Sequence, residues 1–236
     1  MHMGGSALVK AVETMLAKGR VIAAGLLQAP PGQVEFLGGR FVVSGDPARG
    51  IDLLAVAAAA RDPASSPSAD ASGLDTYVWN LLDLITFPNG CHIAEVEIDP
   101  DTGEVRLDRY TAVDDFGDLI NPMLTLGQIQ GGVVQGIGQA MLEHTVYDPQ
   151  SGQLLSGSLM DYTLPRAADI PPLDIRFNGV PTAANPLGLK GAGQAGAIAS
   201  PQAVVCAVLD ALAPLGVTHI DMPVTPERVW RAMQAR

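Results

Sequence analysis

The sequence is poor in cysteine and in positive charge. Its two cysteines, Cys91 and Cys206, are too few for a disulfide framework and lack the spacing of a zinc site. We expect both to be buried: Cys206 lies within an apolar helix pattern, and Cys91, which could instead face a pocket, begins a strand pattern. The 14 Lys and Arg against 25 Asp and Glu give a net charge of −11, which argues against nucleic acid as a ligand.

Long uninterrupted apolar runs are also missing. The longest stretches are broken by Asp210 or by prolines before the roughly 20 residues that a membrane span requires. Lys10, Glu13 and Lys18 interrupt the apolar pattern near the N-terminus, which is unlike a signal peptide. We therefore expect no membrane segment and a cytoplasmic location. The 236 residues, 47% hydrophobic, suffice for one large domain or two small ones.

The N-terminal third predicts a helix followed by a hairpin. Ser6 is a suitable N-cap for an amphipathic helix over 7–27. Two short strands over 34–37 and 40–43 flank the two-residue turn Gly38-Gly39, and a short helix is expected over 51–60. The polar, low-complexity run 61–72 is expected to be a mobile loop or an internal boundary. We accordingly divide the chain into 1–60, a loop region 61–75, and 76–236.

The remaining sequence predicts an α+β fold, with β-hairpins and a mixed sheet packed against two long helices. The expected elements are strands over 91–98 and 104–113, a helix over 123–143, a strand and loop over 156–166, an edge-type strand over 171–177, a helix over 197–212, and a C-terminal helix. Thr225 is expected to cap that last helix, with Trp230 and Met233 as its anchors.

Three polar residues near these strands have ordinary structural explanations. His92 has no second metal ligand nearby in sequence, so we interpret it as a surface or hydrogen-bonded histidine. Asp114 and Asp115 could act as a general acid and base, but paired acids at a strand end also fix turns, and we favour that role.

The glycine-rich stretch 187–196 leads directly into an apolar helix and carries Gln194 at its tip. Four glycines in ten residues allow close approach to a ligand, and a helix N-terminus favours an anion. Gly191, Gly193 and Gly196 match a dinucleotide-binding fingerprint, but prolines at 181 and 186 disfavour the required preceding strand and only 40 residues follow. A tight turn and a ligand-facing loop of another fold remain as alternatives, and we favour the loop.

The helix expected over 123–143 has an unusual composition. Within 127–139 it contains five glycines and four glutamines, and each glycine costs nearly 1 kcal/mol of helix stability relative to alanine. One interpretation is a ligand that approaches closely, because glutamines offer neutral donors and acceptors suited to a polar, uncharged ring such as a pterin. The other is tight helix–helix packing through small residues. The sequence leaves both open.

Taken together, these motifs resemble the C-terminal part of the molybdenum-binding large subunit of the xanthine dehydrogenase, aldehyde oxidase and carbon monoxide dehydrogenase family. The resemblance runs in order over nearly the whole chain. It is carried by segments 87–90, 92–103, 112–115, 120–122, 127–132, 135–138, 160–162, 185–193 and 221–230.

The resemblance implies an oxidoreductase that hydroxylates an aldehyde or N-heterocycle with water, using molybdenum and molybdopterin, expected in its cytosine dinucleotide form. It implies that 76–236 is a cofactor-binding region and assigns cofactor contacts to six residues: Gly127, Gln128, Lys190, Gly191, Ala192 and Gly193. Gln194 stands where the family has a glutamate that acts as general base. Since an amide cannot accept the proton, we expect ordinary hydroxylation to be impaired, altered or absent.

The resemblance also implies that the chain lacks much of the family's cofactor cage. We therefore expect a cofactor-binding segment that is inactive alone, whether a fragment or one piece of a split subunit. Its expected partners are the N-terminal half of the molybdenum subunit, an iron–sulfur subunit and a flavin subunit. An exposed apolar face would favour such a partner or self-association. The alternative is a non-catalytic interaction or scaffold domain that retains the fold.

Overall fold

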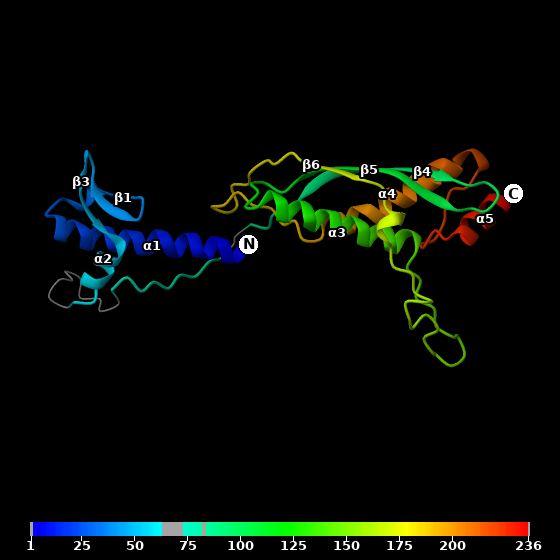
Figure 1. Cartoon of the computed structure of the whole chain (residues 1–236), viewed down its shortest axis with the longest axis horizontal. Coiled ribbons are helices and arrows are strands. Elements are labelled where there is room, and N and C mark those ends of the chain that lie inside the picture. Colours follow the sequence, from blue (N-terminus) through cyan, green and yellow to red (C-terminus); the bar gives the residue numbers. More distant parts are fainter. Residues whose placement is uncertain (1, 63–72, 82–83, 236) are drawn as a thin grey trace. The chain divides into compact units, whose positions relative to one another are not determined.

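The computed structural model describes residues 2–62, 73–81 and 84–235, and its internal contacts divide the chain into two units. Unit 1 comprises Met1–Asp83 with Asn185–Leu187, and unit 2 comprises Leu84–Ala184 with Gly188–Arg236. Most of the predicted low-complexity loop, 63–72, lies outside the described residues. Each unit has its own hydrophobic core. Figure 1 shows the elements of both units.

Unit 1 packs helix α1 (His2–Leu27) and helix α2 (Leu53–Ala59) against a three-stranded antiparallel sheet. Its strands are β1 (Val34–Leu37), β2 (Arg40–Val43) and β3 (Asp46–Asp52), in the order β1-β2-β3, and a short 3-10 turn (Pro31–Gln33) precedes them. The predicted hairpin is confirmed, with φ of 56° at Gly38 and 84° at Gly39. Phe41 is fully buried and packs closely on α1 where Gly19 lacks a side chain.

Two predictions for unit 1 are wrong. Ser6 does not cap α1, because the helix begins four residues earlier; the buried Ser6 hydroxyl instead donates to the His2 carbonyl at 2.6 Å. Strand β3 was not expected because Pro47 and Gly50 weaken its pattern, and it takes Ile51 from the predicted helix. As the outer strand of the sheet, it tolerates a proline that a central strand would exclude.

Unit 2 is a mixed three-stranded sheet with two helices along one face (Figure 1). Strands β4 (Asn89–Ile98) and β5 (Val105–Asp115) form the predicted antiparallel hairpin, and β6 (Leu173–Phe177) pairs parallel with β5. Helices α3 (Pro122–Met141) and α4 (Ala195–Leu212) pack on this sheet and on each other. The buried core between these layers contains Tyr110, Phe116, Ile129, Val133, Ile137 and Val204.

The C-terminal helix α5 (Pro226–Gln234) begins as predicted, because the Thr225 hydroxyl accepts from Arg228 N at 3.4 Å. Its anchor is Val229, which is fully buried, and not the exposed Trp230. In helical geometry these neighbouring positions face directions about 100° apart, so only one of them can point at the core. Met233, four residues after Val229, packs against the same cluster, as predicted.

Both cysteines are exposed, contrary to expectation. Alternate β4 residues from His92 to Ile98 face the helices, so Cys91 points to the opposite face of the strand. On α4 the buried positions 200, 204, 208 and 212 recur every four residues, and Cys206 lies between two of them on the other side of the helix.

The region between α3 and β6 differs from its predicted structure. No strand forms over 156–166, and a short 3-10 turn follows at Ala167–Asp169. A second 3-10 turn, Ala213–Leu215, lies elsewhere, directly after α4. Residues 144–161 form an arm that leaves the end of α3 (Figure 1) and contains an isolated Tyr147–Leu154 bridge. Its base is fixed by Tyr162, whose hydroxyl donates to Glu143 Oε2 at 2.5 Å.

The segment Ala195–Leu215 is long and apolar enough, by length and composition alone, to cross a membrane. The expectation that Asp210 or prolines interrupt every such stretch is therefore wrong here. Core helices of folded proteins meet the same criterion, and α4 packs along α3 and β4 in unit 2.

Candidate functional site

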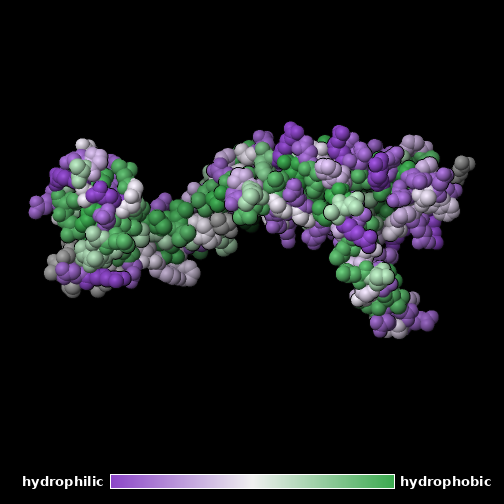
Figure 2. Space-filling view, viewed as in Figure 1, coloured by the Kyte–Doolittle hydropathy of each residue, from purple (hydrophilic) through white to green (hydrophobic). Residues whose placement is uncertain are grey.

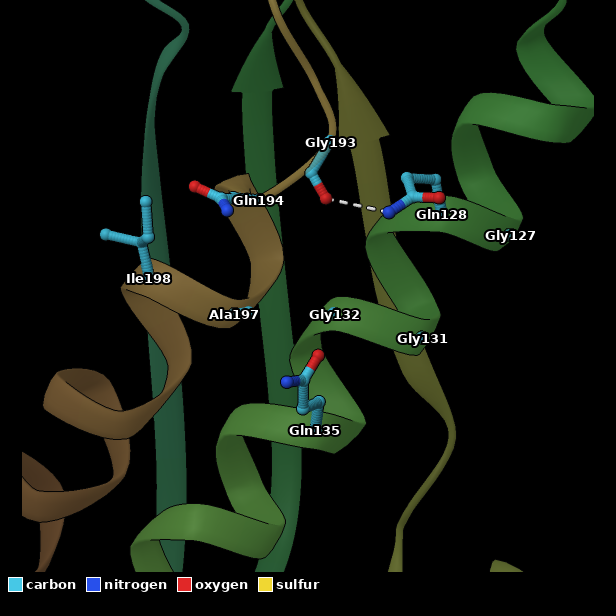
Figure 3. Close-up of a pocket in the computed structure, with 9 residues that line it drawn as sticks. All are labelled: Gly127, Gln128, Gly131, Gly132, Gln135, Gly193, Gln194, Ala197 and Ile198. Carbon is cyan, nitrogen blue, oxygen red and sulfur yellow. Dashed lines mark hydrogen bonds between the residues drawn. The ribbon is translucent and has the colours of Figure 1, made fainter.

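Helix α3 carries the polar residues of the site on one face. Its start is fixed by Asn121, whose side chain accepts from Leu124 N at 3.1 Å, and by Pro122 in the first turn. Gln128, Gly131 and Gln135 follow at spacings of three and four, which places them on one side of the helix. The first two turns of α4 lie beside this face (Figure 3).

Helices α3 and α4 approach so closely that three glycines have little or no room for a side chain. A Cβ atom at Gly132 would lie 3.0 Å from Ala197 N, and one at Gly196 would lie 2.6 Å from the Ile129 carbonyl oxygen. At Gly136 a Cβ would collide with the Ser200 hydroxyl and lie 2.8 Å from Pro201 Cδ. The helix-packing interpretation of the glycine-rich sequence is thus correct for these positions.

A pocket of about 400 Å³ opens where α3 meets the start of α4 (Figure 3). None of its lining side chains is charged. The unpaired N–H groups of the first turn of α4 lie next to it, and Gln194, the N-cap, makes no side-chain capping bond to them. The lining residues are Gly127, Gln128, Gly131, Gly132, Gln135, Gly193, Gln194, Ala197 and Ile198.

Three lining glycines have no structural requirement within the chain. A Cβ atom at Gly127, Gly131 or Gly193 would meet nothing within 4 Å, and none of the three has a positive φ. Alanine would therefore fit, and in α3 it would favour the helix by nearly 1 kcal/mol at each position. Glycine at these positions keeps space free on the pocket side, as expected where a ligand approaches the backbone.

Gln128 reaches across the pocket to the loop before α4. Its Nε2 donates to the Gly193 carbonyl oxygen at 2.7 Å, a contact between residues 65 apart in sequence. Gln194 lies on the other side of Gly193, with its side chain exposed (Figure 3). The predicted cofactor residue and the predicted catalytic position are therefore brought to one site.

Lys190 is held by Asp115 and does not line the pocket. Its Nζ lies 2.5 Å from Asp115 Oδ2, and both side chains are nearly buried. The other carboxylate oxygen accepts from Gly117 N and Val180 N, each at 2.9 Å. Hydrogen bonding from Lys190, and then from these two amides, holds the pKa of Asp115 well below its usual range. Asp115 thus fixes the turn, as favoured from the sequence, and pairs with the loop.

Asp114 belongs to a separate buried cluster. His92 Nε2 lies 3.0 Å from Asp114 Oδ1, and His92 Nδ1 lies 2.8 Å from the Tyr110 hydroxyl. Burial, reinforced by the negative charge of Asp114, raises the pKa of Tyr110. The interpretation of His92 as a hydrogen-bonded histidine is confirmed. Among residues 2–62, 73–81 and 84–235, no three His, Cys, Asp or Glu side chains are placed to hold a metal ion.

Of the seven site residues expected from the sequence, four line the pocket: Gly127, Gln128, Gly193 and Gln194. Lys190, Gly191 and Ala192 lie in the same loop but not in the lining. The lining residues that were not assigned are Gly131, Gly132, Gln135, Ala197 and Ile198. The helical spacing from Gln128 would have identified the first three, whereas the α4 residues have no distinctive signal.

Comparison with known families places the chain in a family of cofactor-binding domains. A family model described as a molybdopterin cofactor-binding domain matches residues 1–171. The chain belongs to this family of molybdopterin-binding domains. It corresponds to part of the molybdenum-binding subunit of the molybdenum hydroxylases, as the sequence resemblance implied.

Curated relatives match almost the whole chain. It is 35% identical to the carbon monoxide dehydrogenase large chain of Hydrogenophaga pseudoflava, covering 98% of this chain and 28% of that protein. It is 37% identical to the 6-hydroxypseudooxynicotine dehydrogenase complex subunit gamma of Paenarthrobacter nicotinovorans, covering 98% and 29%. The chain therefore spans less than a third of the length of these relatives.

Solved structures confirm the fold of this molybdopterin-binding domain. Quinoline 2-oxidoreductase from Pseudomonas putida 86 matches with a TM-score of 0.85 and 39% identity, over 96% of this chain and 29% of that one. A Cu,Mo-dependent CO dehydrogenase matches with a TM-score of 0.88 and 32% identity, over 98% and 29%.

Proposed function

We propose that this chain forms one wall of the molybdopterin site of a multi-subunit molybdenum hydroxylase. The observation that carries the proposal is the set of open glycines, Gly127, Gly131 and Gly193, in the pocket of a chain from the molybdopterin-binding family. At these positions there is space that the protein's own described side chains do not fill, and a ligand could occupy it. No contact among the described residues requires glycine at these positions, although alanine would favour the helix at the two positions in α3.

The residues of the pocket suit a pterin. A pterin is a flat, polar heterocycle whose edges both donate and accept hydrogen bonds, and the amides of Gln128, Gln135 and Gln194 offer both kinds of group without charge. The first-turn N–H groups of α4 add donors with a favourable dipole for phosphate oxygens. The cytosine dinucleotide form of the cofactor is part of the proposal, supported by the similarity to CO dehydrogenase and quinoline oxidoreductase chains.

When bound, the molybdenum and pterin supply the two-electron redox chemistry for hydroxylating a carbon with water. The contribution of this chain is to bind and orient the cofactor through α3 and the loop 190–194. We propose an aldehyde or N-heterocycle as the substrate class. Relatives of the chain include quinoline 2-oxidoreductase and the large subunit of nicotine 6-hydroxylase, whose names refer to N-heterocycles.

Gln194 limits what the assembled site can do. It occupies the N-cap position of α4 at the pocket rim, where a carboxylate could accept a proton and an amide cannot. Loss of a general base lowers a rate by about 10²- to 10⁴-fold. We therefore propose that hydroxylation is weak or altered with the present residue. A non-catalytic scaffold that retains the fold is the second candidate, and Gln194 is the observation that favours it.

Partners are part of the same proposal. The relatives are a CO dehydrogenase large chain and a subunit of a dehydrogenase complex, which supports iron–sulfur and flavin partners and a further portion of the molybdenum subunit. Exposed apolar side chains support a covering partner or self-association. On the arm 144–161 they lie between α3 and a hydrophilic tip (Figure 2), and comprise Leu154, Leu155, Leu159 and Met160.

The deciding experiment measures molybdenum and pterin in the chain purified alone and after co-expression with the remaining portion of a molybdenum subunit and its neighbouring genes. We expect both in the co-expressed complex and neither in the chain alone. If the complex also lacks molybdenum and pterin, the cofactor role is wrong and the scaffold candidate replaces it.

Gln194→Glu tests the catalytic part of the proposal in the loaded complex. We expect hydroxylation of an aldehyde or N-heterocycle panel to rise about 10²- to 10⁴-fold because the carboxylate can accept a proton. Gln139→Glu makes the same change at an exposed α3 position outside the pocket and should leave the rate unchanged. A complex with normal cofactor content and no gain with Gln194→Glu would contradict the assigned role of this position.

A further inference from the structure

The loop Lys190–Gln194 is held at its front end by an ion pair and a short backbone ladder. Lys190 N donates to the Phe116 carbonyl at 2.8 Å, and Leu189 forms an isolated bridge with Gly117. The Lys190 side chain reaches Asp115 at the end of β5. Asp115 also accepts hydrogen bonds from two backbone N–H groups, and these bonds hold its carboxylate in position to pair with the lysine.

The rear end of the loop is held by Gln128 from α3. Since the Gly193 carbonyl can only accept a hydrogen bond, the atom of Gln128 that meets it must be the NH₂ group, at 2.7 Å. The hydrogen bond to the loop therefore sets the orientation of the Gln128 side chain. Immediately beyond, Gly196 packs on the Ile129 carbonyl, so the start of α4 is tied to the same turn of α3.

The stretch between the two anchors has little else to order it. Gly191 and Gly193 carry no side chains and would have open space around a Cβ atom, and only Ala192 packs against the core. Glycine loses more backbone entropy on ordering than any other residue. A loop of this composition needs external anchors to present Gln194 in one position.

We infer that Asp115 and Gln128 are positioning residues that act through Lys190 and Gly193 to fix the loop at the pocket rim. Neither anchor lies in the glycine motif itself, and their two side chains come from different elements, the end of β5 and α3. The inference rests on the proposed function only for the identity of the ligand. The anchoring of the loop is a property of the chain alone.

Hydrogen–deuterium exchange of the full chain without cofactor tests this arrangement. Gln128→Ala should raise exchange about two- to tenfold at Ile198 N–H, which donates to the Gln194 carbonyl, and leave Lys190 N–H, which donates to the Phe116 carbonyl, unchanged. Asp115→Asn should do the reverse, because asparagine can still accept from Gly117 and Val180 but loses the ion pair with Lys190. Peptides from β4 and β5 away from residue 115 report whether either variant unfolds unit 2.

Matched variants separate anchoring from general destabilisation. Gln135→Ala removes a glutamine that lines the same pocket without a bond to the loop, and should leave exchange at Ile198 unchanged. Gln128→Glu, which lacks the donor, should behave like Gln128→Ala, whereas Gln128→Lys restores a donor and should return exchange toward the wild-type rate. Equal effects of Gln135→Ala and Gln128→Ala, no rescue by lysine, or no end-specific difference would overturn the inference.

Because the readout uses the chain alone, it is independent of cofactor loading. If the complex contains no molybdenum, the proposed function is wrong, but the expected exchange pattern does not change. Conversely, if molybdenum content is normal and exchange is unchanged in Gln128→Ala and Asp115→Asn, the positioning role is wrong and the proposed function is supported.

Discussion

Helix α3 has two rows of glycine that are indistinguishable in sequence and opposite in environment. Gly132 and Gly136 face α4, where an added Cβ would meet backbone or side-chain atoms at close range. Gly127 and Gly131 face the pocket, where an added Cβ would meet nothing within 4 Å. One row is required by contacts within the chain, and the other has no such requirement.

The two rows separate contacts that the chain makes within unit 2 from a pocket face of α3 that no described side chain of unit 2 fills. The α3–α4 contact and the Asp115–Lys190 pair are satisfied inside unit 2. The pocket side of α3 keeps helix-destabilising glycines beside unused space. The packing interpretation of the glycine-rich helix is therefore correct for the face toward α4, whereas the ligand interpretation stays a prediction for the pocket face. Substitutions on the closed side should change stability, and those on the open side should change ligand binding.

The largest effect is expected on the closed side, from Gly136→Val. The new side chain would collide with Ser200 and the Pro201 ring, and overpacking of this kind costs about 3 kcal/mol or more at the upper end of its range. Urea unfolding of the chain measures the change in unfolding free energy. A loss below about 1 kcal/mol would show that the two helices can separate and that the distinction between the rows is weak.

An intermediate effect is expected from Asp115→Asn, and it should depend on pH. The pKa of Asp115 is lower in the folded chain than in the unfolded one, so its contribution is complete above the unfolded value of about 4 and is lost as pH falls through the folded value. The variant should be less stable than wild type at pH 7, and the gap should narrow below about pH 4.

Asp174→Asn is the matched control for that measurement. It breaks an ion pair with Arg176 in which both side chains are largely exposed, so solvent screening should leave its effect small at every pH. Urea titrations at pH 7, 5 and 3 compare the two variants. A gap between Asp115→Asn and wild type that stayed constant with pH would contradict the assigned ion pair.

The smallest effect on stability is expected on the open side, from Gly131→Ala. The chain should be unchanged or up to about 1 kcal/mol more stable, because alanine favours the helix and its methyl group meets no protein atom. The molybdenum and pterin content of the co-expressed complex should nevertheless fall. Destabilisation comparable to that of Gly136→Val would abolish the contrast between the two rows.

Local patterns predicted most elements of the fold. The alternation of residues 91–98 and 104–113 predicted the β4–β5 hairpin, and Asn121-Pro122 predicted the start of α3. These signals are read within a few residues, by side-chain alternation or by capping hydrogen bonds. The failures involve orientation: Cys206 and Trp230 lie in correctly predicted helices but face solvent, because the direction of burial depends on partner elements far away in sequence.

For the site, the sequence by itself determined the residue types: a glycine-rich loop ending in Gln194 and a helix rich in glycine and glutamine. Only the tertiary structure decided how they are used. It joined Gln128 to Gly193 across 65 residues, took Lys190 into an ion pair with Asp115, and divided the glycines between packing and open space. The physical reason is that glycine in a helix looks the same in sequence whether a neighbouring backbone or a ligand needs its room, and only the packed neighbours show which.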